Sequence, residues 1–301
     1  MSQANHPSFI TLPAPAEHTT VLAFLIKQFP HISQDVWVER MSAGKVFWRD
    51  DQGLDSDINR NTPYQPNKTL GYYREVPEEP KVPFKEIIIE HSDHFLIAHK
   101  PPFLPVMPGG VFVNECLQER LIKGTGIPDL QAVHRLDRDT SGLVLFSTNP
   151  KTRHQYHQLF SERTIKKQYQ AIAAVRGDEK IQGQSWHIKN HLKRSTPKFL
   201  FENCAETKAG QYAESVIECI EQSSSKALFT LSPITGRTHQ LRLHMQHIGF
   251  PILNDRFYPT LQPKEPDNYQ KPLQLHAKNL SFIDPVSKRE LEFISPGSLE
   301  I

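Results

Sequence analysis

The pattern of apolar and polar positions predicts two helices and a short strand near the start of the chain. TTVLAFLIKQF (19–29) has apolar side chains at helical spacing after a threonine cap, and a proline ends it. SQDVWVERMSA (33–43) begins at a serine cap, and Gly44 is a suitable stop. KVFW (45–48) follows as a short strand, and then an acidic turn (50–57). Helix, helix, glycine and strand form one compact predicted unit.

Further along the chain the pattern changes mainly to strands. EIIIE (86–90) and HFLIAHK (94–100) predict a strand pair around a short polar turn. Asn149, followed by a proline, is typical of a helix start and predicts a helix through Phe160. IKKQYQAIAAV (165–175) alternates as a strand does. One face of this strand carries Ile165, Lys167, Tyr169, Ala171 and Val175.

A proline-containing stretch marks the expected boundary between two domains. REVPEEPKVPF, which ends at residue 84, holds three prolines and shows no apolar period. A length of 301 residues leaves room for two domains. We therefore expect a loose arm at 1–18, a small domain at 19–75, a linker at 76–84 and a large domain at 85–301.

Composition and cysteine usage predict a cytoplasmic protein. Hydrophobic residues make up 38% of the chain, which suits a sizeable core. Three scattered cysteines argue against a disulfide framework and against a cysteine-built zinc site. The first residues lack the basic start and apolar run of a secretory signal, and no stretch reaches the apolar length of a membrane span.

Charge is unevenly distributed, although the net charge is only +2. Residues 151–200 contain 11 Lys or Arg against 3 acids, and 11 − 3 leaves +8 in this segment. Such a basic stretch favours a polyanionic partner, because cations that neutralise phosphates release counterions. A solvated face beside acidic neighbours would explain the same pattern. Charge alone leaves both interpretations open.

The strongest candidate for chemistry is the stretch AVHRLDRDTSGLVLF (132–146). Asp137 lies just before an apolar run that predicts a buried strand, and arginines flank it. Neighbouring guanidiniums favour the charged form of a carboxylate, so Asp137 is a candidate nucleophile or base. A turn held by a structural acid–arginine tie is the alternative. Asp139, just before Thr140, is better explained as a turn cap.

A second cluster lies in ITGRTHQLRLHMQHIGFPILNDRFY (234–258), where arginines and histidines interrupt an apolar pattern. Its histidines suggest a metal site. They lack the cysteine or carboxylate ligands expected in a closed, four-coordinate zinc site, so we predict no metal. Tyr169 is a third candidate, and a half-buried strand tyrosine is its plainer explanation.

Taken together, these stretches resemble the RluA-like family of RNA pseudouridine synthases. HRLDRDTSG (134–142) is similar to the family's catalytic motif, and K-x-Y-x-A occurs at 167–171. The family's arginine motif is similar to ITGRTHQLRLHM, followed by G-x-P-I-x-x-D-x-x-Y (249–258) and LHAKNLSFIDP (275–285). Five motifs in the right order, spread over roughly 85–285, make the resemblance specific.

The resemblance implies roles for individual residues. Asp137 matches the aspartate that attacks the target uridine, and Tyr169 the tyrosine that stacks on the base and helps to remove its C5 proton. Arg242 lies where the family has a basic residue paired with the aspartate, with Arg237 as the second candidate. Residues expected to contact RNA are His134, Arg135, Arg138, Lys167, Arg237 and His239.

The resemblance also implies an α+β catalytic domain with a mixed, mostly antiparallel central sheet and a catalytic cleft. The expected activity is isomerisation of specific uridines in structured RNA, with ribosomal RNA as the first and transfer RNA as the second substrate. No cofactor, metal or membrane is expected, and the protein is predicted to be a monomer. The route by which Asp137 acts stays open among attack at C6, attack at C1′ and removal of a sugar proton.

Two rival functions would explain part of the same sequence pattern. A non-catalytic RNA-binding or ribosome-assembly factor would keep the fold without turnover, but the intact Asp137–Tyr169–Arg242 set argues against it. An RNA glycosidase or nuclease usually needs a second carboxylate or a histidine pair in acid–base roles. Asp139 is the available second carboxylate, and its predicted place in a turn argues against that role.

Two segments depart from the family pattern. PPFLPVMPGGVFVNECLQERL (101–121) replaces a more standard loop, and we expect it to affect substrate choice or RNA access. Residues 19–75 resemble a diverged form of the small helix-helix-strand RNA-binding domain first seen in a ribosomal protein. Its second helix carries Asp35 and Glu39 against Arg40, so RNA binding and a packing role are both open for this unit.

Overall fold

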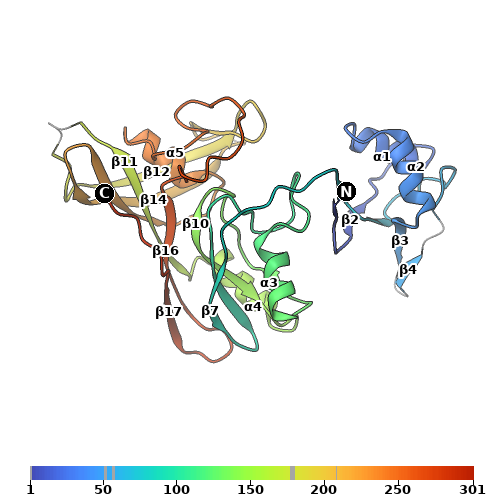
Figure 1. Cartoon of the computed structure of the whole chain (residues 1–301), viewed down its shortest axis with the longest axis horizontal. Coiled ribbons are helices and arrows are strands. Elements are labelled where there is room, and N and C mark those ends of the chain that lie inside the picture. Colours follow the sequence, from blue (N-terminus) through green and yellow to red (C-terminus); the bar gives the residue numbers. More distant parts are fainter. Residues whose placement is uncertain (1, 51–52, 56–57, 177–179, 208) are drawn as a thin grey trace. The chain divides into compact units, whose positions relative to one another are not determined.

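The computed structural model describes residues 2–50, 53–55, 58–176, 180–207 and 209–301 (Figure 1). Part of the predicted acidic turn, 51–52 and 56–57, lies outside these ranges. The chain divides into two compact units. The small unit comprises Met1–Pro80 with Gly109–Asn114, and the large unit comprises Lys81–Pro108 with Glu115–Ile301.

The small unit contains the two predicted helices beside a four-stranded antiparallel sheet. Thr20 and Ser33 cap the helices, and their side chains accept hydrogen bonds from the backbone nitrogens of Ala23 and Val36. Gly44 follows the second helix with φ +67°, as its role as a stop requires. The elements are α1 (Val21–Gln28), α2 (Gln34–Ser42) and the sheet β2 (Ser8–Thr11), β5 (Thr69–Tyr72), β3 (Val46–Asp50), β4 (Gly53–Asp55). A separate pair joins β1 (Ser2–Gln3) to β6 (Glu75–Val76).

The prediction of a loose arm at 1–18 was wrong for its middle part. Residues 8–11 form β2, which pairs with β5 across 58 or more positions of sequence. Leu12 is fully buried and packs with Trp37 and Leu70 in the core of this unit. Strand pairing at such a distance leaves no mark in a polar, proline-containing stretch, so local pattern could not reveal it.

The large unit is built on an 11-stranded mixed sheet, as the predicted α+β class requires. Its path is β13-β12-β14-β15-β11-β16-β10-β8-β7, with β17 beside β16 and β9 beside β10. Among the described strands of this sheet, only the β10–β16 pair is parallel. The strands are β7 (Ile87–His91), β8 (Phe95–Lys100), β9 (Gln131–Ala132), β10 (Ser141–Ser147), β11 (Lys166–Ala174), β12 (Ser185–Arg194), β13 (Phe201–Cys204), β14 (Gln211–Gln222), β15 (Lys226–Pro233), β16 (Leu275–Ile283) and β17 (Glu290–Ile294).

Three helices accompany this sheet: α3 (Leu117–Thr125), α4 (Arg153–Ser161) and α5 (Gln240–His247). The helix predicted from Asn149 begins four residues later, because Asn149 first closes a turn. Its side chain accepts from the backbone nitrogen of Lys151, and its carbonyl accepts from that of Arg153. None of the described helices is long and apolar enough to cross a membrane.

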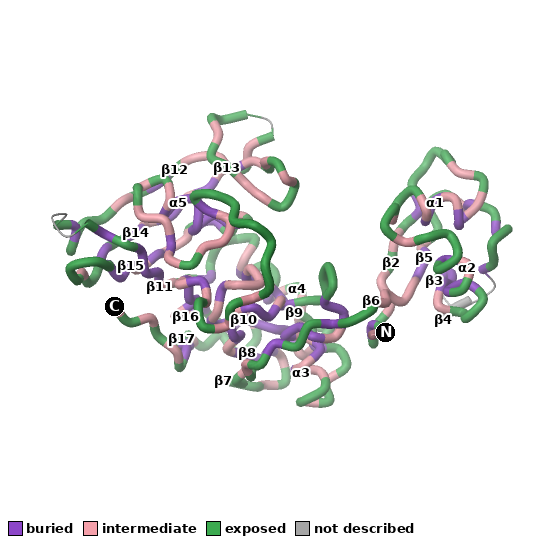
Figure 2. The backbone as a smooth tube through the Cα atoms, turned by 45° about the horizontal axis from the view of Figure 1, so that its top comes forward, coloured by how far each residue is buried: buried purple, intermediate pink, exposed green. Residues whose placement is uncertain are grey.

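Two buried clusters lie along the large sheet (Figure 2). One joins α5 to β11, β14 and β15 through Leu241, Met245 and Phe229. The other joins α4 to β8 and β10 through Tyr156 and Leu145. The strands β10, β16 and β11 are neighbours in the sheet and contribute to these clusters, and the loop that precedes β10 carries Asp137.

Gly142 permits the close approach of β10 and β16. Its φ is +113°, and an added Cβ would lie 2.2 Å from the carbonyl oxygen and 2.5 Å from the nitrogen of Ala277. We expect Gly142→Ala to lower the free energy of unfolding by about 3 kcal/mol, because backbone cannot yield as a side chain does. Urea unfolding would measure this. The control is Gly124→Ala in α3, where a Cβ meets nothing within 4 Å, and where we expect a gain of about 0.5–1 kcal/mol. A mild cost at Gly142, similar to a surface change, would contradict the prediction.

Candidate active site

A cavity of about 450 Å³ opens beside the loop between β9 and β10. Five segments of the large unit supply its walls: this loop, the stretch from the end of α4 to β11, the first half of β11, the stretch from β15 into α5, and the start of β16. The predicted catalytic residues Asp137, Tyr169 and Arg242 all line it. Residues that are far apart in sequence therefore meet at one place, as a reaction on a single base requires.

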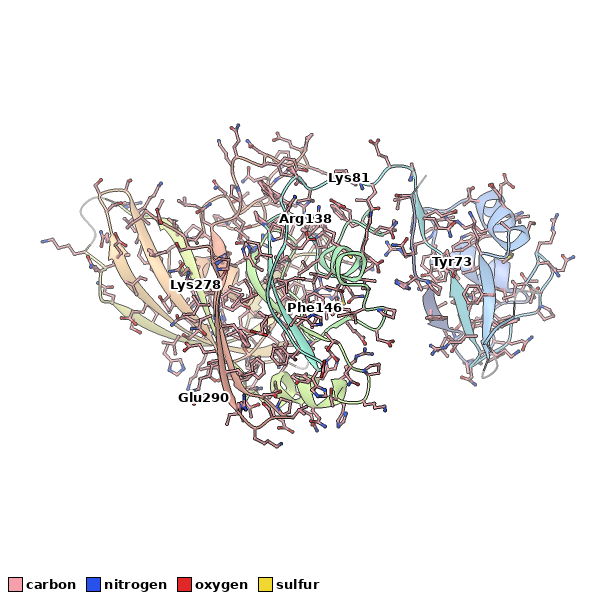
Figure 3. The ribbon with its side chains drawn as sticks, turned by 60° about the horizontal axis from the view of Figure 1, so that its bottom comes forward. Tyr73, Lys81, Arg138, Phe146, Lys278 and Glu290 are labelled. Carbon is pink, nitrogen blue, oxygen red and sulfur yellow. The ribbon has the colours of Figure 1, made fainter. Side chains whose placement is uncertain are left out.

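The loop that carries Asp137 is anchored by a buried lysine. Figure 3 labels Arg138 just before β10 and Phe146 within it. Lys100 is fully buried, and its Nζ donates to the carbonyl oxygens of Pro101, Leu104 and Arg138 at 2.7–2.9 Å. Burial lowers the pKa of Lys100 to about 7, while Asp139 and Asp137 act in the opposite direction. Lys100 thus ties the residue next to Asp137 to a neighbouring loop.

Arg242 stands between two carboxylates. Its Nε and Nη2 donate to Asp255 at 2.7 and 2.5 Å, and its Nη1 lies 3.5 Å from Oδ2 of Asp137. Burial lowers the pKa of Arg242, but Asp255 and then Asp137 raise it above its usual value. Asp255 is itself fixed, since its Oδ1 accepts from the backbone nitrogens of Phe257 and Tyr258. The guanidinium is therefore held rigidly, and its third nitrogen faces the Asp137 carboxylate.

The aromatic rings of Phe257 and Tyr258 complete the support of Arg242. The guanidinium carbon lies 4.7 Å from the Phe257 ring centre and 5.3 Å from that of Tyr258. The Tyr258 hydroxyl also lies 2.9 Å from Nδ1 of His239, whose Nε2 is 3.9 Å from Asp137. Burial lowers the pKa of His239, so its neutral form is favoured. His239 is thereby placed in support of Asp137 rather than at the rim.

Tyr169 faces Asp137 from β11, just after a shift in strand register between Gln168 and Tyr169. Burial, followed by the charge of Asp137, raises the pKa of its hydroxyl. The hydroxyl is therefore protonated near neutral pH and can donate a hydrogen bond. The ring offers an apolar face to a planar ligand in the same cavity.

The residues predicted to contact RNA fall into different positions. Arg135, Lys167 and Arg237 line the cavity, as does His134. The Nε2 of His134, however, accepts from the Leu145 nitrogen at 3.0 Å, and its ring stacks on Phe160. Burial, with a smaller effect of Lys167, lowers the pKa of His134 to about 3. His134 is therefore neutral and offers no charge to a phosphate.

Arg138 does not line the cavity, which weakens the prediction that it contacts RNA there. Its two terminal nitrogens donate to Asp267 at 2.8 and 2.9 Å, and Nη2 also lies 2.9 Å from Asp139. The charge of Arg138 is thus already matched by carboxylates. Asp139 is likewise held outside the cavity.

Sequence reasoning missed several residues that shape the site. Asp255 was noted only as part of a motif, and Lys100 only as part of a strand. Gln240, buried in α5, accepts from Thr235 and from the Arg237 nitrogen, and so fixes the turn before the helix. Arg163, just after α4, lines the cavity. Its place in the basic stretch 151–200 was the signal available for it.

The three histidines of the second cluster do not gather around a common point. His244 lies 3.0 Å from the Asn190 oxygen, and His239 lies against Tyr258. Within the described ranges, no group of three His, Cys, Asp or Glu side chains is arranged to hold a metal ion.

Buried histidines make the fold sensitive to acid. Burial lowers the pKa of His244 and of His276 to about 4, and that of His134 to about 3. Between about pH 6.5 and 4 the unfolded chain therefore binds more protons, so stability falls as pH falls. Each histidine contributes up to about 1.4 kcal/mol per pH unit. Urea unfolding at about pH 7 and about pH 5 would show the loss, and His244→Gln should reduce it; an unchanged slope in that variant would contradict this assignment.

Comparison with known sequences supplies independent information about this site. Residues 94–247 match the family described as RNA pseudouridylate synthase. The chain is 34% identical over 219 residues to a dual-specificity RNA pseudouridine synthase RluA from Pasteurella multocida, which covers 69% of this chain and 92% of that protein. It is 28% identical over 249 residues to a ribosomal large subunit pseudouridine synthase C from Vibrio cholerae, which covers 80% and 72%.

Solved structures resemble the fold as well. Human RNA Pseudouridylate Synthase Domain Containing 1 matches with a TM-score of 0.58 at 24% identity, covering 73% of this chain and 86% of that one. Human RNA Pseudouridylate Synthase Domain Containing 4 matches with a TM-score of 0.53 at 24% identity, covering 69% and 87%. Identities this low support a common fold for the matched part of the chain.

Proposed function

The chain belongs to the RluA-like family of RNA pseudouridine synthases, and from this we propose that it converts specific uridines of structured ribosomal RNA to pseudouridine through Asp137. The enzyme is an isomerase. Transfer RNA is the second proposed substrate, because several relatives are described as dual-specificity RluA. Ribosomal RNA is the first proposed substrate, because other relatives are described as ribosomal large subunit pseudouridine synthase C. We propose a cytoplasmic monomer, with residues 85–301 as the catalytic domain.

One observation carries the proposal: Asp137 is the only carboxylate among the residues that line the cavity. Arg242, the cation that faces it, is committed to Asp255 on its other side. The lining also includes Arg135, Arg163, Lys167 and Arg237, which have no acidic partner among the described residues. A single carboxylate inside a cavity lined by cations suits an anionic substrate that needs one nucleophile or base.

The reaction rearranges the bonds of the uridine itself and transfers no atoms or electrons to a second substrate. The N1–C1′ bond of uridine breaks, the uracil turns, and a C5–C1′ bond forms while C5 loses a proton and N1 gains one. In each of the three routes open to Asp137, the first step uses a single carboxylate. The uracil must leave its stack to reach that carboxylate, which favours a target in a loop or bulge.

We propose that Tyr169 holds the turned uracil by stacking and passes on the C5 proton. A neutral hydroxyl suits a relay that gives up its own proton as it accepts one. Tyr169→Phe keeps the ring, so we expect unchanged RNA affinity and a rate about 100-fold lower, within the usual range for proton transfer by a positioned side chain. Single-turnover kinetics at saturating RNA would measure the rate. A rate equal to that of the parent would exclude the hydroxyl from the reaction.

We propose that the second helix of the small unit has a structural role within that unit and does not bind RNA. Arg40 of α2 is buried, and its Nε donates to Glu75 at 2.9 Å. Lys45 pairs with the same carboxylate. The basic groups around this helix are therefore neutralised within the unit.

The rival reactions find less support in this geometry. A glycosidase or nuclease would place a second acid or a charged histidine at the reacting base. Asp139 lies outside the cavity beside Arg138, and burial keeps His134 neutral. Detection of free uracil or cut RNA with the purified enzyme would restore these rivals.

A pseudouridine map of ribosomal and transfer RNA would test the proposal. Maps would compare cells that lack the gene with cells rescued by the parent protein or by Asp137→Asn. A site that disappears on deletion and returns only with the parent would identify the substrate. If every site survives deletion, and the purified protein modifies none of these RNAs, the non-catalytic RNA-binding role replaces this one.

A further inference from the structure

We propose that Arg163, Lys167 and Arg237 form a subsite for one backbone phosphate next to the target uridine. The inference rests on the proposed function. It assigns the phosphate to one wall of the cavity, formed by the end of α4, the start of β11 and the turn before α5. Asp137 is left for the base and sugar, with Arg242 held beside it by Asp255.

Lys167 is the main reason for this assignment. Its side chain lines the cavity from β11, and among the described residues its Nζ has one long contact, 3.5 Å, to the carbonyl oxygen of Thr235. Burial, followed by the charge of Arg163, lowers its pKa to about 8. A half-buried ammonium without a carboxylate is costly, and a phosphate would compensate that cost.

Arg163 and Arg237 lie close to the same point. Arg163 lines the same cavity as Lys167, and its charge is the second cause, after burial, of the lowered pKa of Lys167. The Nε of Arg237 donates to the Tyr212 carbonyl at 3.0 Å, which leaves its terminal nitrogens for other partners. Lys167 lies near the same turn, since its Nζ is 3.8 Å from the position that a Cβ of Gly236 would take.

No acid in the described part of the chain neutralises this trio. The carboxylate associated with Tyr212 is Glu214, and its oxygens are already engaged. They accept from the Tyr212 hydroxyl at 2.7 Å and from His187 at 2.8 Å, and Lys189 lies 3.5 Å away. Cations that line one cavity without a carboxylate partner are stabilised by an anion placed between them.

The spacing suits a phosphate of the target nucleotide itself. Lys167 lies two residues before Tyr169 on β11, about 6.6 Å along an extended backbone, and the pairing with β16 shifts register between Gln168 and Tyr169. A uracil stacked on Tyr169 would carry its sugar and adjoining phosphate over about this distance. Tyr169 would then contact the base of the target nucleotide while Lys167 contacts its phosphate.

The salt dependence of RNA binding tests this subsite. For a single strand, log K falls with log salt by about 0.7 for each phosphate neutralised. With a short single-stranded RNA that has one central uridine, we expect Arg163→Gln plus Lys167→Gln to reduce this slope by up to about 0.7, because both contact the same phosphate and only Arg237 is left to neutralise it. Lys123→Gln, in α3 and outside the cavity, is the control and should leave the slope unchanged. An unchanged slope in the double variant, or a loss of about 1.4 for two separate phosphates, would overturn the inference.

An RNA with a neutral methylphosphonate linkage locates the phosphate. We expect this linkage on one side of the target uridine to weaken binding by the parent, and Lys167→Gln to weaken it no further. If the linkage has no effect on either side, or if Lys167→Gln adds its full loss on both modified RNAs, the subsite is not there.

Pseudouridine formation by the parent separates this inference from the proposed function. If no RNA is converted while the slopes change as expected, the function is wrong and the anion subsite stands. If uridine is converted but the slopes of parent and double variant agree, the function stands and the subsite does not.

Discussion

Purified Asp137→Asn is expected to bind RNA as the parent does and to form no measurable pseudouridine. Removal of a nucleophile or essential base costs roughly 10⁴-fold or more in rate. The asparagine keeps the size of the side chain, so Arg242 stays in place through its two bonds to Asp255. The backbone anchor also survives, because Lys100 donates to the carbonyl of Arg138 and not to the Asp137 side chain.

The measurement pairs RNA affinity with a single-turnover assay for pseudouridine. Thermal unfolding of both proteins serves as the control for folding. If Asp137→Asn lost RNA binding and stability together, Asp137 would be a structural acid in an arginine-rich turn. If the variant kept a rate within about tenfold of the parent, the reaction would have to use another group, and the only lining carboxylate would have been misassigned.

The local sequence pattern predicted an element correctly wherever the interactions that form it join residues close together in the chain. The two helices of the small unit follow their caps, Thr20 and Ser33, which bind backbone nitrogens only three residues away. The strand pair at 86–100 is closed by a short turn, and the structure confirms it as β7 and β8. These features depend on neighbours, so the sequence contains the information directly.

Long-range pairing decided the features that were missed. Arg138 looked available for RNA, but its partner Asp267 lies 129 positions later in the chain. The partner of β2 was hidden in the same way. Lys100 looked like the end of an ordinary strand, yet three carbonyls surround its ammonium group. The identity of a buried partner is a property of the tertiary fold, and a single sequence does not reveal it.

The choice between Arg237 and Arg242 shows where resemblance added to the residues. Composition alone offers both arginines as partners for Asp137. The motif favoured Arg242, and the helix α5 turns its side chain toward Asp137 while Arg237 binds the Tyr212 carbonyl. Asp255 is the second carboxylate that binds Arg242, and only the three-dimensional structure identifies it as that partner.

Arg242→Met should reveal both tasks of this arginine, since it leaves Asp255 buried without its cation. Breaking a buried ion pair from one side costs about 3–5 kcal/mol, so we expect a loss of this size in the free energy of unfolding. We also expect activity to fall about 1,000-fold, because a preorganised charge beside the reacting group disappears. Urea unfolding and single-turnover kinetics would measure the two losses separately.

The double variant Arg242→Met/Asp255→Asn distinguishes folding from catalysis. In the parent, the Phe257 and Tyr258 nitrogens donate to Oδ1 of Asp255, and asparagine keeps an oxygen that can accept these bonds. Asparagine is neutral, so it leaves no unpaired charge in the buried site. We therefore expect most of the stability to return, since replacing both members of a buried pair is often nearly neutral. Activity should stay low, because Asp137 still lacks the guanidinium 3.5 Å away. Recovery of activity together with stability would mean that Arg242 serves the fold alone and that Asp137 needs no cation to react.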